Sequence, residues 1–189
     1  MVLKANKTIR PALICLFSVM CLFVWAGCED PAGQKTVARE NPAHSEKSPD
    51  RIIVHLYFSD SDNSFLISEE RSLSARIRPE LLGFQIINAL LEGPQKALER
   101  TIPEGTLLRG FYILQDRTAC VDLSREIREH HPGGAKSELM TIYSIVNSLI
   151  LNIPEIETVR ILVEGKEEAT LAGHVDLRFP FQANMLFVR

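Results

Sequence analysis

The segment of this chain that most resembles a metal site is a short acidic loop, Asp60-Ser61-Asp62-Asn63-Ser64. Oxygen side chains at alternate positions are the ligands that an EF-hand loop offers to calcium. Such a loop also needs glycine at its sixth position and glutamate at its twelfth, where this chain has Phe65 and Arg71. The sequence therefore predicts a solvated turn here and no calcium site.

Histidines are the next candidates for chemistry, as metal ligands or as a general base. His130 and His131 are adjacent and precede Pro132-Gly133-Gly134, and no nearby pair of carboxylates or cysteines completes a metal site with them. We expect an exposed loop at this position. A small hydrolase would instead use His130, His131 or His174 with a carboxylate, and this arrangement stays open as the catalytic alternative.

Signatures of nucleophilic catalysis and of phosphate binding are missing from the sequence. The chain contains no Gly-x-Ser-x-Gly elbow and no Gly-x-x-x-x-Gly-Lys-[Ser/Thr] loop. Cys120 lies in an apolar segment, where a free thiol usually packs as a small hydrophobic group. Glu164, Glu167 and Glu168 flank a turn, so we expect them to be solvated. The sequence thus predicts a protein that is not an enzyme and has no catalytic residues, metal or cofactor.

Cys28 has the most informative surroundings in the chain. Three basic residues lie within the first ten positions, Pro11 to Ala26 carry no charge, and Gly27 directly precedes the cysteine. This is the order of a bacterial export signal, and it predicts a lipoprotein signal peptide at 1–27 with lipid attached to Cys28. An uncleaved anchor and a plain signal peptide stay open, because Trp25 stands where an aliphatic residue is usual. Each reading exports the domain, and lipid would hold it at the cell envelope, on the periplasmic or outer face.

Charge and cysteine content limit the partners and the source of stability. Removal of residues 1–27 takes away three basic residues and no acidic one, so 18 Lys and Arg remain against 24 Asp and Glu, a formal charge of −6. Nucleic acid and anionic surfaces are disfavoured as partners. Cys120 is the single cysteine after Cys28, so no internal disulfide is available and stability must come from a packed core.

The remaining chain divides into a linker and one domain. Residues 28–50 hold three prolines, mixed charge and no apolar periodicity, which is typical of a flexible linker. Residues 51–189 are long enough for one domain. An α+β fold is expected, a small two-layer sandwich whose mixed sheet of about five or six strands carries two helices on one face. The predicted strands are 52–58, 65–73, 106–115, 117–123, 159–163 and 168–171, and the predicted helices are 79–93 and 135–152, with a short helical turn at 125–129.

Eight short motifs follow one another in a characteristic order between positions 52 and 178. Together they resemble the GerM-type (GerMN) domain of sporulation and spore germination proteins, and most of them specify turns and helix ends. The resemblance implies a non-catalytic envelope lipoprotein that acts as a scaffold or binds a partner, with a fold similar to ring-building domains of trans-envelope machines. The motifs are Leu56-Tyr57-Phe58, Glu70-Arg71, Leu91-Glu92-Gly93-Pro94, Ile102-Pro103-Glu104-Gly105-Thr106, Val121-Asp122-Leu123-Ser124, Ile145-Val146-Asn147-Ser148-Leu149, Val163-Glu164-Gly165 and Gly173-His174-Val175-Asp176.

The end of the chain is unusually apolar and is the predicted partner surface. Phe181, Met185, Leu186 and Phe187 either close the core or offer an apolar strand to a partner. We expect that partner to be an envelope protein or a second copy of the chain. A peptidoglycan-binding accessory is the alternative, although Trp25 is the single tryptophan, so a tryptophan-lined glycan groove is absent.

Overall fold

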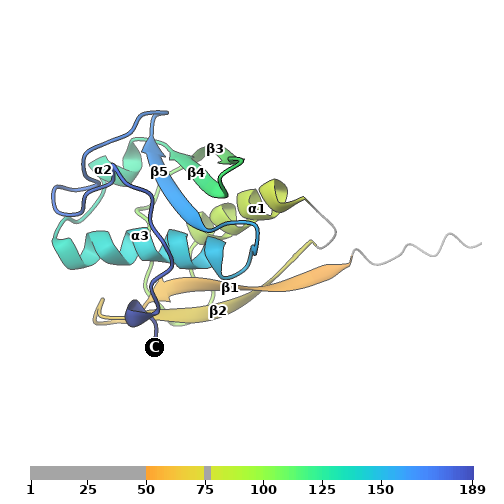
Figure 1. The fold of residues 1–189 in the computed structure, drawn as a ribbon. Coiled ribbons are helices and arrows are strands. Elements are labelled where there is room, and N and C mark those ends of the chain that lie inside the picture. Colours follow the sequence, from red (N-terminus) through yellow and green to blue (C-terminus); the bar gives the residue numbers. More distant parts are fainter. Residues whose placement is uncertain (1–49, 75–77) are drawn as a thin grey trace, which may run out of the picture. The chain divides into compact units, whose positions relative to one another are not determined.

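The computed structural model describes residues 50–74 and 78–189 (Figure 1). The predicted signal peptide 1–27, the predicted lipid site Cys28 and the linker up to residue 49 lie outside the described residues. Within those described ranges, no helix combines the length and the apolar character that crossing a bilayer requires.

The first two strands form an antiparallel hairpin of their own. β1 (Arg51–Ser59) pairs along its whole length with β2 (Leu66–Ser74), as the sequence predicts. The Asp60 carboxylate closes the turn by accepting hydrogen bonds from the backbone N–H groups of Ser64 at 2.6 Å and Phe65 at 3.2 Å. The bond from Ser64 is the main cause that lowers the pKa of Asp60. The acidic loop is therefore organised as a turn by its first residue.

Three helices follow the positions predicted from the sequence. α1 (Pro79–Glu92) begins at a proline, which has no N–H to leave unpaired in the first turn, and it ends at Gly93 with φ +92°. α2 (Glu126–Glu129) is a single turn, and α3 (Ala135–Ile150) is the longest helix. α3 carries an apolar stripe at helical spacing, whose members Ile142, Val146 and Leu149 have no exposed surface.

The second sheet has the strand order β3-β4-β5. β3 (Leu108–Ile113) and β4 (Thr118–Leu123) are antiparallel, and β5 (Thr158–Val163) pairs with β4 in parallel. On β3 the Phe111 side chain packs in the core, whereas Tyr112 is 58% exposed.

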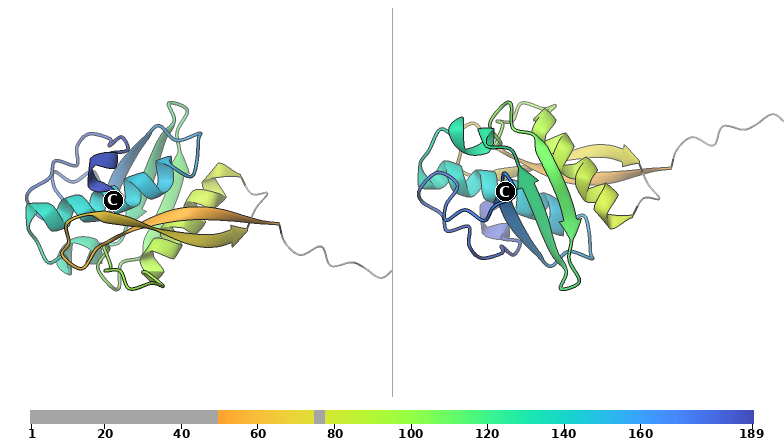
Figure 2. Two further views of the ribbon diagram at one scale, coloured as in Figure 1. Left: turned by 90° about the horizontal axis from the view of Figure 1, so that it is seen from below. Right: turned by 90° about the horizontal axis from the view of Figure 1, so that it is seen from above.

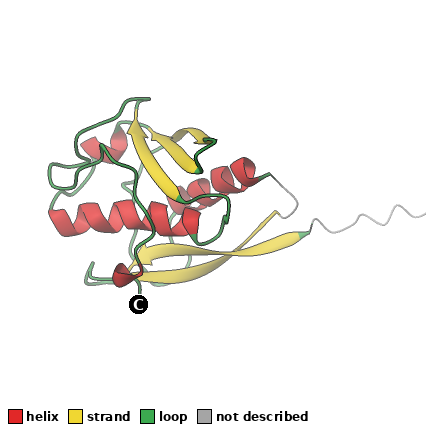
Figure 3. Cartoon of the chain, viewed as in Figure 1, coloured by secondary structure: helices red, strands yellow, loops and turns green. Residues whose placement is uncertain are grey.

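The helices α1 and α3 lie between the two sheets (Figure 3). The predicted α+β class is confirmed, but the strands form two sheets of two and three strands instead of one sheet with both helices on one face. The sheet that contains β1 does not continue toward β5, because β1 lies between β2 and α3 (Figure 2). Side chains of α3 and of Asn152, just after its end, bind the free backbone groups of β1. The predicted strand 168–171 is also wrong, since this segment is irregular and forms only an isolated bridge, between Thr170 and Asp176.

One main apolar core joins the two sheets through the helices. It includes residues from β1, α1, β3, β4, α3 and β5, and Leu171 and Leu177 from the C-terminal irregular segment close it. From β3 and β4 it takes Phe111, Ala119, Val121 and Leu123, and Leu108 and Ile113 pack against it. A smaller cluster of Tyr57, Leu66 and Met140 lies under the end of the chain.

Candidate functional site

The C-terminal segment that the sequence singles out is partly built into the domain. Tyr143 of α3 packs between two of its aromatic residues. Phe181 meets the Tyr143 ring edge-on, with centroids 6.1 Å apart, and Phe187 stacks on it at 4.7 Å. These two predicted partner residues therefore help to cover the helix, in the manner expected of a closed core.

The other two predicted residues point outward. Met185 is 54% exposed and Leu186 is 84% exposed, and both belong to the single 3₁₀ turn η1 (Met185–Phe187). Beside this turn lies an open depression of about 560 Å³ bounded by Tyr143, Phe181 and neighbouring residues of the tail. The tail thus combines anchoring residues with a small exposed apolar surface, which we call the tail patch and define as Met185 and Leu186.

Hydrogen bonds hold the tail patch in place. The Asn147 side chain on α3 donates to the Asn184 carbonyl at 3.1 Å and accepts from the Asn184 N–H at 2.9 Å. Asn184 in turn accepts from the Leu186 N–H at 3.0 Å, and Phe181 forms a two-bond bridge with Val159 of β5. Asn147, which lies within the sixth motif, thus bonds to the backbone of the C-terminal segment. The exposed leucine is therefore presented by a fixed backbone.

A larger open groove of about 660 Å³ lies between α2 and the turn after β5. Its lining carries both signs of charge, with Arg125, Arg128 and Lys166 among glutamates. Arg128 pairs with Glu168 at 2.9 Å across the groove. The glutamates that the sequence places around this turn are solvated or ion-paired, so none of them forms an acid–base pair with a nucleophile.

His131 lies in the wall of this groove and is fixed through both ring nitrogens. Nδ1 accepts from the Gly133 N–H at 3.0 Å, and Nε2 lies 3.1 Å from the Thr141 hydroxyl oxygen. Because that hydroxyl donates to the Thr101 carbonyl, Nε2 must be the protonated nitrogen. Burial lowers the pKa of His131, which agrees with a neutral ring. A nitrogen that already accepts a backbone hydrogen bond is not free to act as a general base.

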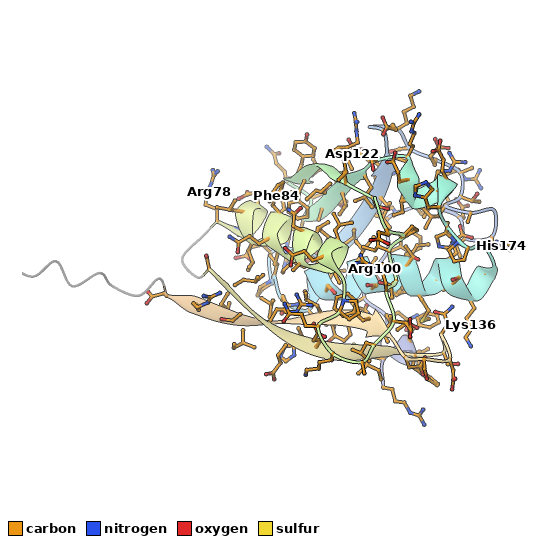
Figure 4. The ribbon with its side chains drawn as sticks, turned by 180° about the vertical axis from the view of Figure 1, so that it is seen from behind. Arg78, Phe84, Arg100, Asp122, Lys136 and His174 are labelled. Carbon is orange, nitrogen blue, oxygen red and sulfur yellow. The ribbon has the colours of Figure 1, made fainter. Side chains whose placement is uncertain are left out.

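A buried carboxylate that the sequence reasoning missed lies beside two of the predicted histidines. Glu138, in the first turn of α3, has no exposed surface and accepts from the backbone N–H groups of Ala172 at 2.7 Å and His174 at 2.9 Å. Burial tends to raise its pKa, but the bonds from the backbone outweigh that effect and the pKa is lowered. The His174 ring reaches the same carboxylate at 3.3 Å, and Figure 4 shows His174 beside the N-terminal turns of α3.

These positions bear directly on the hydrolase alternative. His131 and His174 gather near Glu138, whereas His130 lies apart, with Nδ1 3.2 Å from the Glu104 carbonyl oxygen. The Glu138 carboxylate has no solvent-accessible surface and binds the backbone of the loop that follows Thr170. It therefore holds that loop in place and is not accessible to a substrate. The burial of Glu138 had one signal in the sequence. Glu138 is four residues before the apolar Ile142, and this spacing places the two on one helix face.

A second buried carboxylate, Glu69, also binds the backbone N–H groups of a loop. Glu69 on β2 is 1% exposed and accepts from the backbone N–H groups of Gln95 and Lys96, and Arg71 pairs with it at 2.6 Å. Arg71 also donates to the Gly93 carbonyl at 2.7 Å. The ion pair thus ties the end of α1 to β2. Across residues 50–74 and 78–189, no group of three or more His, Cys, Asp or Glu side chains is placed to hold a metal ion.

Comparisons with known proteins agree with this architecture. The Germane family, described as sporulation and spore germination, matches residues 55–169. A candidate lipoprotein from Clostridium perfringens is 30% identical, with a TM-score of 0.51 over 70% of this chain and 87% of that one. No functionally curated protein matches the chain.

Two solved structures of the sporulation protein GerM from Bacillus subtilis share the fold. Its first GerMN domain is 18% identical, with a TM-score of 0.52 over 70% of this chain and 96% of that one. The tandem GerMN domains are 19% identical, with a TM-score of 0.54 over 70% of this chain and 45% of that one. The resemblance read from the motifs is confirmed, and the chain belongs to the Germane family of sporulation and spore germination domains.

Proposed function

We propose that this protein is a lipid-anchored envelope protein whose Germane domain binds a protein partner without catalysis, in sporulation, germination or another task of cell-envelope assembly. The observation that carries the proposal is the tail patch. Leu186 is 84% exposed, yet hydrogen bonds from Asn184 and Asn147 fix the backbone that presents it. A rigid exposed apolar residue loses little conformational entropy when a partner covers it.

Anchoring to the envelope is supported by the sequence and by one relative. Cys28 follows an uncharged segment with basic residues before it, which is the order of a lipoprotein signal. The Clostridium perfringens protein, 30% identical, is itself named as a candidate lipoprotein. A lipid on Cys28 would tether the domain through the linker 28–50 and keep the tail patch near the membrane surface.

A non-catalytic role is supported by what the buried polar groups do. Glu69, Glu138 and His131 are the residues whose burial would suit them for acid–base work. Each of them is instead bound to backbone N–H groups of a neighbouring loop. The two carboxylates and the neutral His131 ring therefore stabilise the fold. We expect the domain to act by binding at its surface.

The test uses the full-length chain in its own host. A photo-crosslinking residue at position 186 is expected to give one discrete protein adduct, and the same residue at Leu107, which is 65% exposed just before β3, is expected to give none. Cys28→Ala should abolish the adduct by releasing the protein from the envelope, and mass spectrometry of the N-terminus should find the lipid only on the parent chain.

Two outcomes would contradict the proposal. Equal adducts at positions 186 and 107 would show that the tail patch is not selective. Co-sedimentation of the full-length protein with purified peptidoglycan that survives Leu186→Asp, without any protein adduct, would favour the wall-binding accessory instead.

A further inference from the structure

The outer edge of β2 has unpaired backbone groups. In the antiparallel ladder Glu70 lies opposite His55, and the backbone groups of His55 point away from β2 to bind Asn152. By the alternation of such a ladder, the N–H and C=O groups of Glu70 and of Ser68 point away from β1. Among the described residues, no strand pairs with them.

The tail of the same chain already pairs with this edge at one position. Val188 forms a bridge with Leu66 at the start of β2, running parallel to it, and the Arg189 N–H donates to the Leu66 carbonyl at 3.0 Å. Leu66 has the same orientation in the ladder as Ser68 and Glu70. The bridge covers only the first residue of β2, and the following positions of the edge stay open.

A groove of about 370 Å³ lies beside this edge, between β2 and α1. Leu73, Phe84 and Ala89 give it apolar walls, and Phe84, labelled in Figure 4, is 44% exposed. Alternate side chains of a strand added to β2 would point toward this groove, because they project on the same face as Arg71 and Leu73. The groove and the open edge therefore form one continuous surface for an extended peptide.

The polar groups of the groove specify the side chain that fits it. Gln85 Oε1 is the one buried side-chain oxygen or nitrogen in the described residues without a hydrogen-bond partner. A ligand that donates a hydrogen bond to it would satisfy this acceptor. Glu92 is 72% exposed at the rim and lies 3.9 Å from Arg71, whose charge is already neutralised by Glu69 at 2.6 Å. These three side chains therefore leave one negative charge at the groove. Apolar walls, a buried acceptor and an acidic rim match the apolar stem and cationic head of lysine or arginine.

We propose that the open edge of β2 and the groove beside α1 bind an extended basic segment of a partner protein, which adds as a strand to β2 and inserts a Lys or Arg side chain toward Gln85. The inference rests on the proposed partner-binding function and names the class of partner. Backbone bonds to Ser68 and Glu70 give the affinity, and the groove gives the preference for a basic side chain.

The experiment titrates full-length protein in mild detergent with the capped peptide Thr-Lys-Val-Lys-Val-Lys-Thr, which places all its lysines on one strand face. Fluorescence anisotropy gives the affinity, and hydrogen exchange by mass spectrometry reports the amides of 66–74. We expect slower exchange there on binding. Gln85→Glu should tighten binding roughly tenfold, because the peptide lysine then makes a charge-assisted hydrogen bond. Gln85→Leu should weaken binding roughly tenfold, because the acceptor is lost.

Matched controls separate this site from general attraction between charges. Gln115→Glu, at an exposed turn, should leave the affinity unchanged, and exchange in α1 should show that the Gln85 variants fold. A peptide of the same composition with its three lysines adjacent should bind more weakly, and a peptide with glutamate in place of lysine should not bind.

Absence of protection at 66–74, or equal affinity for Gln85→Leu, would overturn the inference. If that result came while the adduct at position 186 persisted, only this inference would fail. Loss of the adduct as well would remove the proposed function.

Discussion

Asn152 binds both backbone groups of His55, as a neighbouring strand would. Its Oδ1 accepts from the His55 N–H at 2.9 Å, and its Nδ2 donates to the His55 carbonyl at 2.7 Å. Two side chains of α3 continue the pattern at Tyr57. Ser148 accepts from its N–H at 3.0 Å and Ser144 donates to its carbonyl at 2.5 Å. Ser144 and Ser148 on α3 and Asn152 in the turn after it, each four residues apart, thus satisfy the free edge of β1, which would otherwise be open to pairing with another chain.

The first prediction concerns this side-chain ladder. Asn152→Ala should lower the free energy of unfolding by roughly 1–2 kcal/mol, because two backbone groups lose their partners at a partly solvated position. Asn152→Asp should cost at least as much, since its second carboxylate oxygen replaces the Nδ2 donor and faces the carbonyl oxygens of His55 and Ser148. Urea unfolding of the full-length chain measures both changes.

Asn88→Ala is the matched control for that measurement. The Asn88 side chain donates only to the Phe84 carbonyl within its own helix, so its loss should change stability by less than about 0.5 kcal/mol. Equal effects of the Asn88 and Asn152 variants would show that the ladder does not stabilise the edge of β1.

The second prediction concerns the contact between α1 and β3. A Cβ placed on Gly83 would lie 2.2 Å from Phe111 Cζ, and the Phe111 ring is buried. Alanine in a helix interior normally stabilises by about 1 kcal/mol relative to glycine. Here the overlap should reverse the sign, and Gly83→Ala should destabilise by roughly 1–3 kcal/mol in urea unfolding.

A double variant isolates the cause of that effect. In a Phe111→Leu background the shorter side chain leaves room for a methyl group, so Gly83→Ala should cost much less there than in the parent chain. A gain in stability for Gly83→Ala in the parent would contradict the close approach of the two elements.

The sequence predicted the helices and most strands because each has a local signal. Proline at the start of α1, glycine at its end and the apolar stripe of α3 act over a few residues. The division into two sheets had no such signal. It depends on which edge of β1 is occupied, and Ser144, Ser148 and Asn152 read in sequence as ordinary polar positions of a helix.

The site shows the same limit. The sequence identified the apolar tail as a candidate surface. In the structure a single 3₁₀ turn directs Phe187 inward and Leu186 outward. Three residues are too few for hydrophobic periodicity to predict which side chain is buried. Glu138 and Glu69 read as surface charges. Their burial follows from backbone N–H groups of loops distant in sequence, and those loops take their positions only in the folded chain.

The third prediction concerns acid stability. The pKa of Glu138 is lowered in the folded chain, so its contribution is present in full above the ordinary value of 4.5 and is lost as the pH falls below it. Glu138→Gln should destabilise by roughly 2–3 kcal/mol at pH 7, because its amide replaces one charged acceptor with a donor that faces backbone N–H groups. The variant should also show a flatter dependence of stability on pH below about 4.5.

Hydrogen exchange identifies where that loss occurs. Amides of 171–175 should exchange faster in Glu138→Gln, and those of β2 should not. Glu129→Gln, at an exposed position of α2, is the control. An unchanged pH profile in the Glu138 variant would show that this carboxylate is not a source of the acid sensitivity.

The fourth prediction concerns His131 at milder acidity. Burial lowers its pKa below the ordinary 6.5, so the stability it contributes is complete above that value and declines as the pH falls toward the folded pKa. Protonation would place a second donor on Nδ1, against the Gly133 N–H. His131→Asn should therefore remove part of the loss of stability on going below pH 6.5, as measured by urea unfolding at a series of pH values. An unchanged pH dependence in this variant would contradict the prediction.

The fifth prediction separates the two roles of the tail. Phe187→Ala removes a ring stacked on Tyr143 at 4.7 Å and should destabilise the domain by roughly 1–3 kcal/mol. Leu186→Asp, one residue away at an 84% exposed position, should change the free energy of unfolding by less than about 0.5 kcal/mol. Urea unfolding gives both values, and crosslinking at Met185 in the Leu186→Asp background reports partner binding. Because stability and binding then depend on adjacent side chains, a stable Leu186→Asp protein that still forms the adduct would place the partner elsewhere. An unfolded one would show that Leu186 belongs to the core.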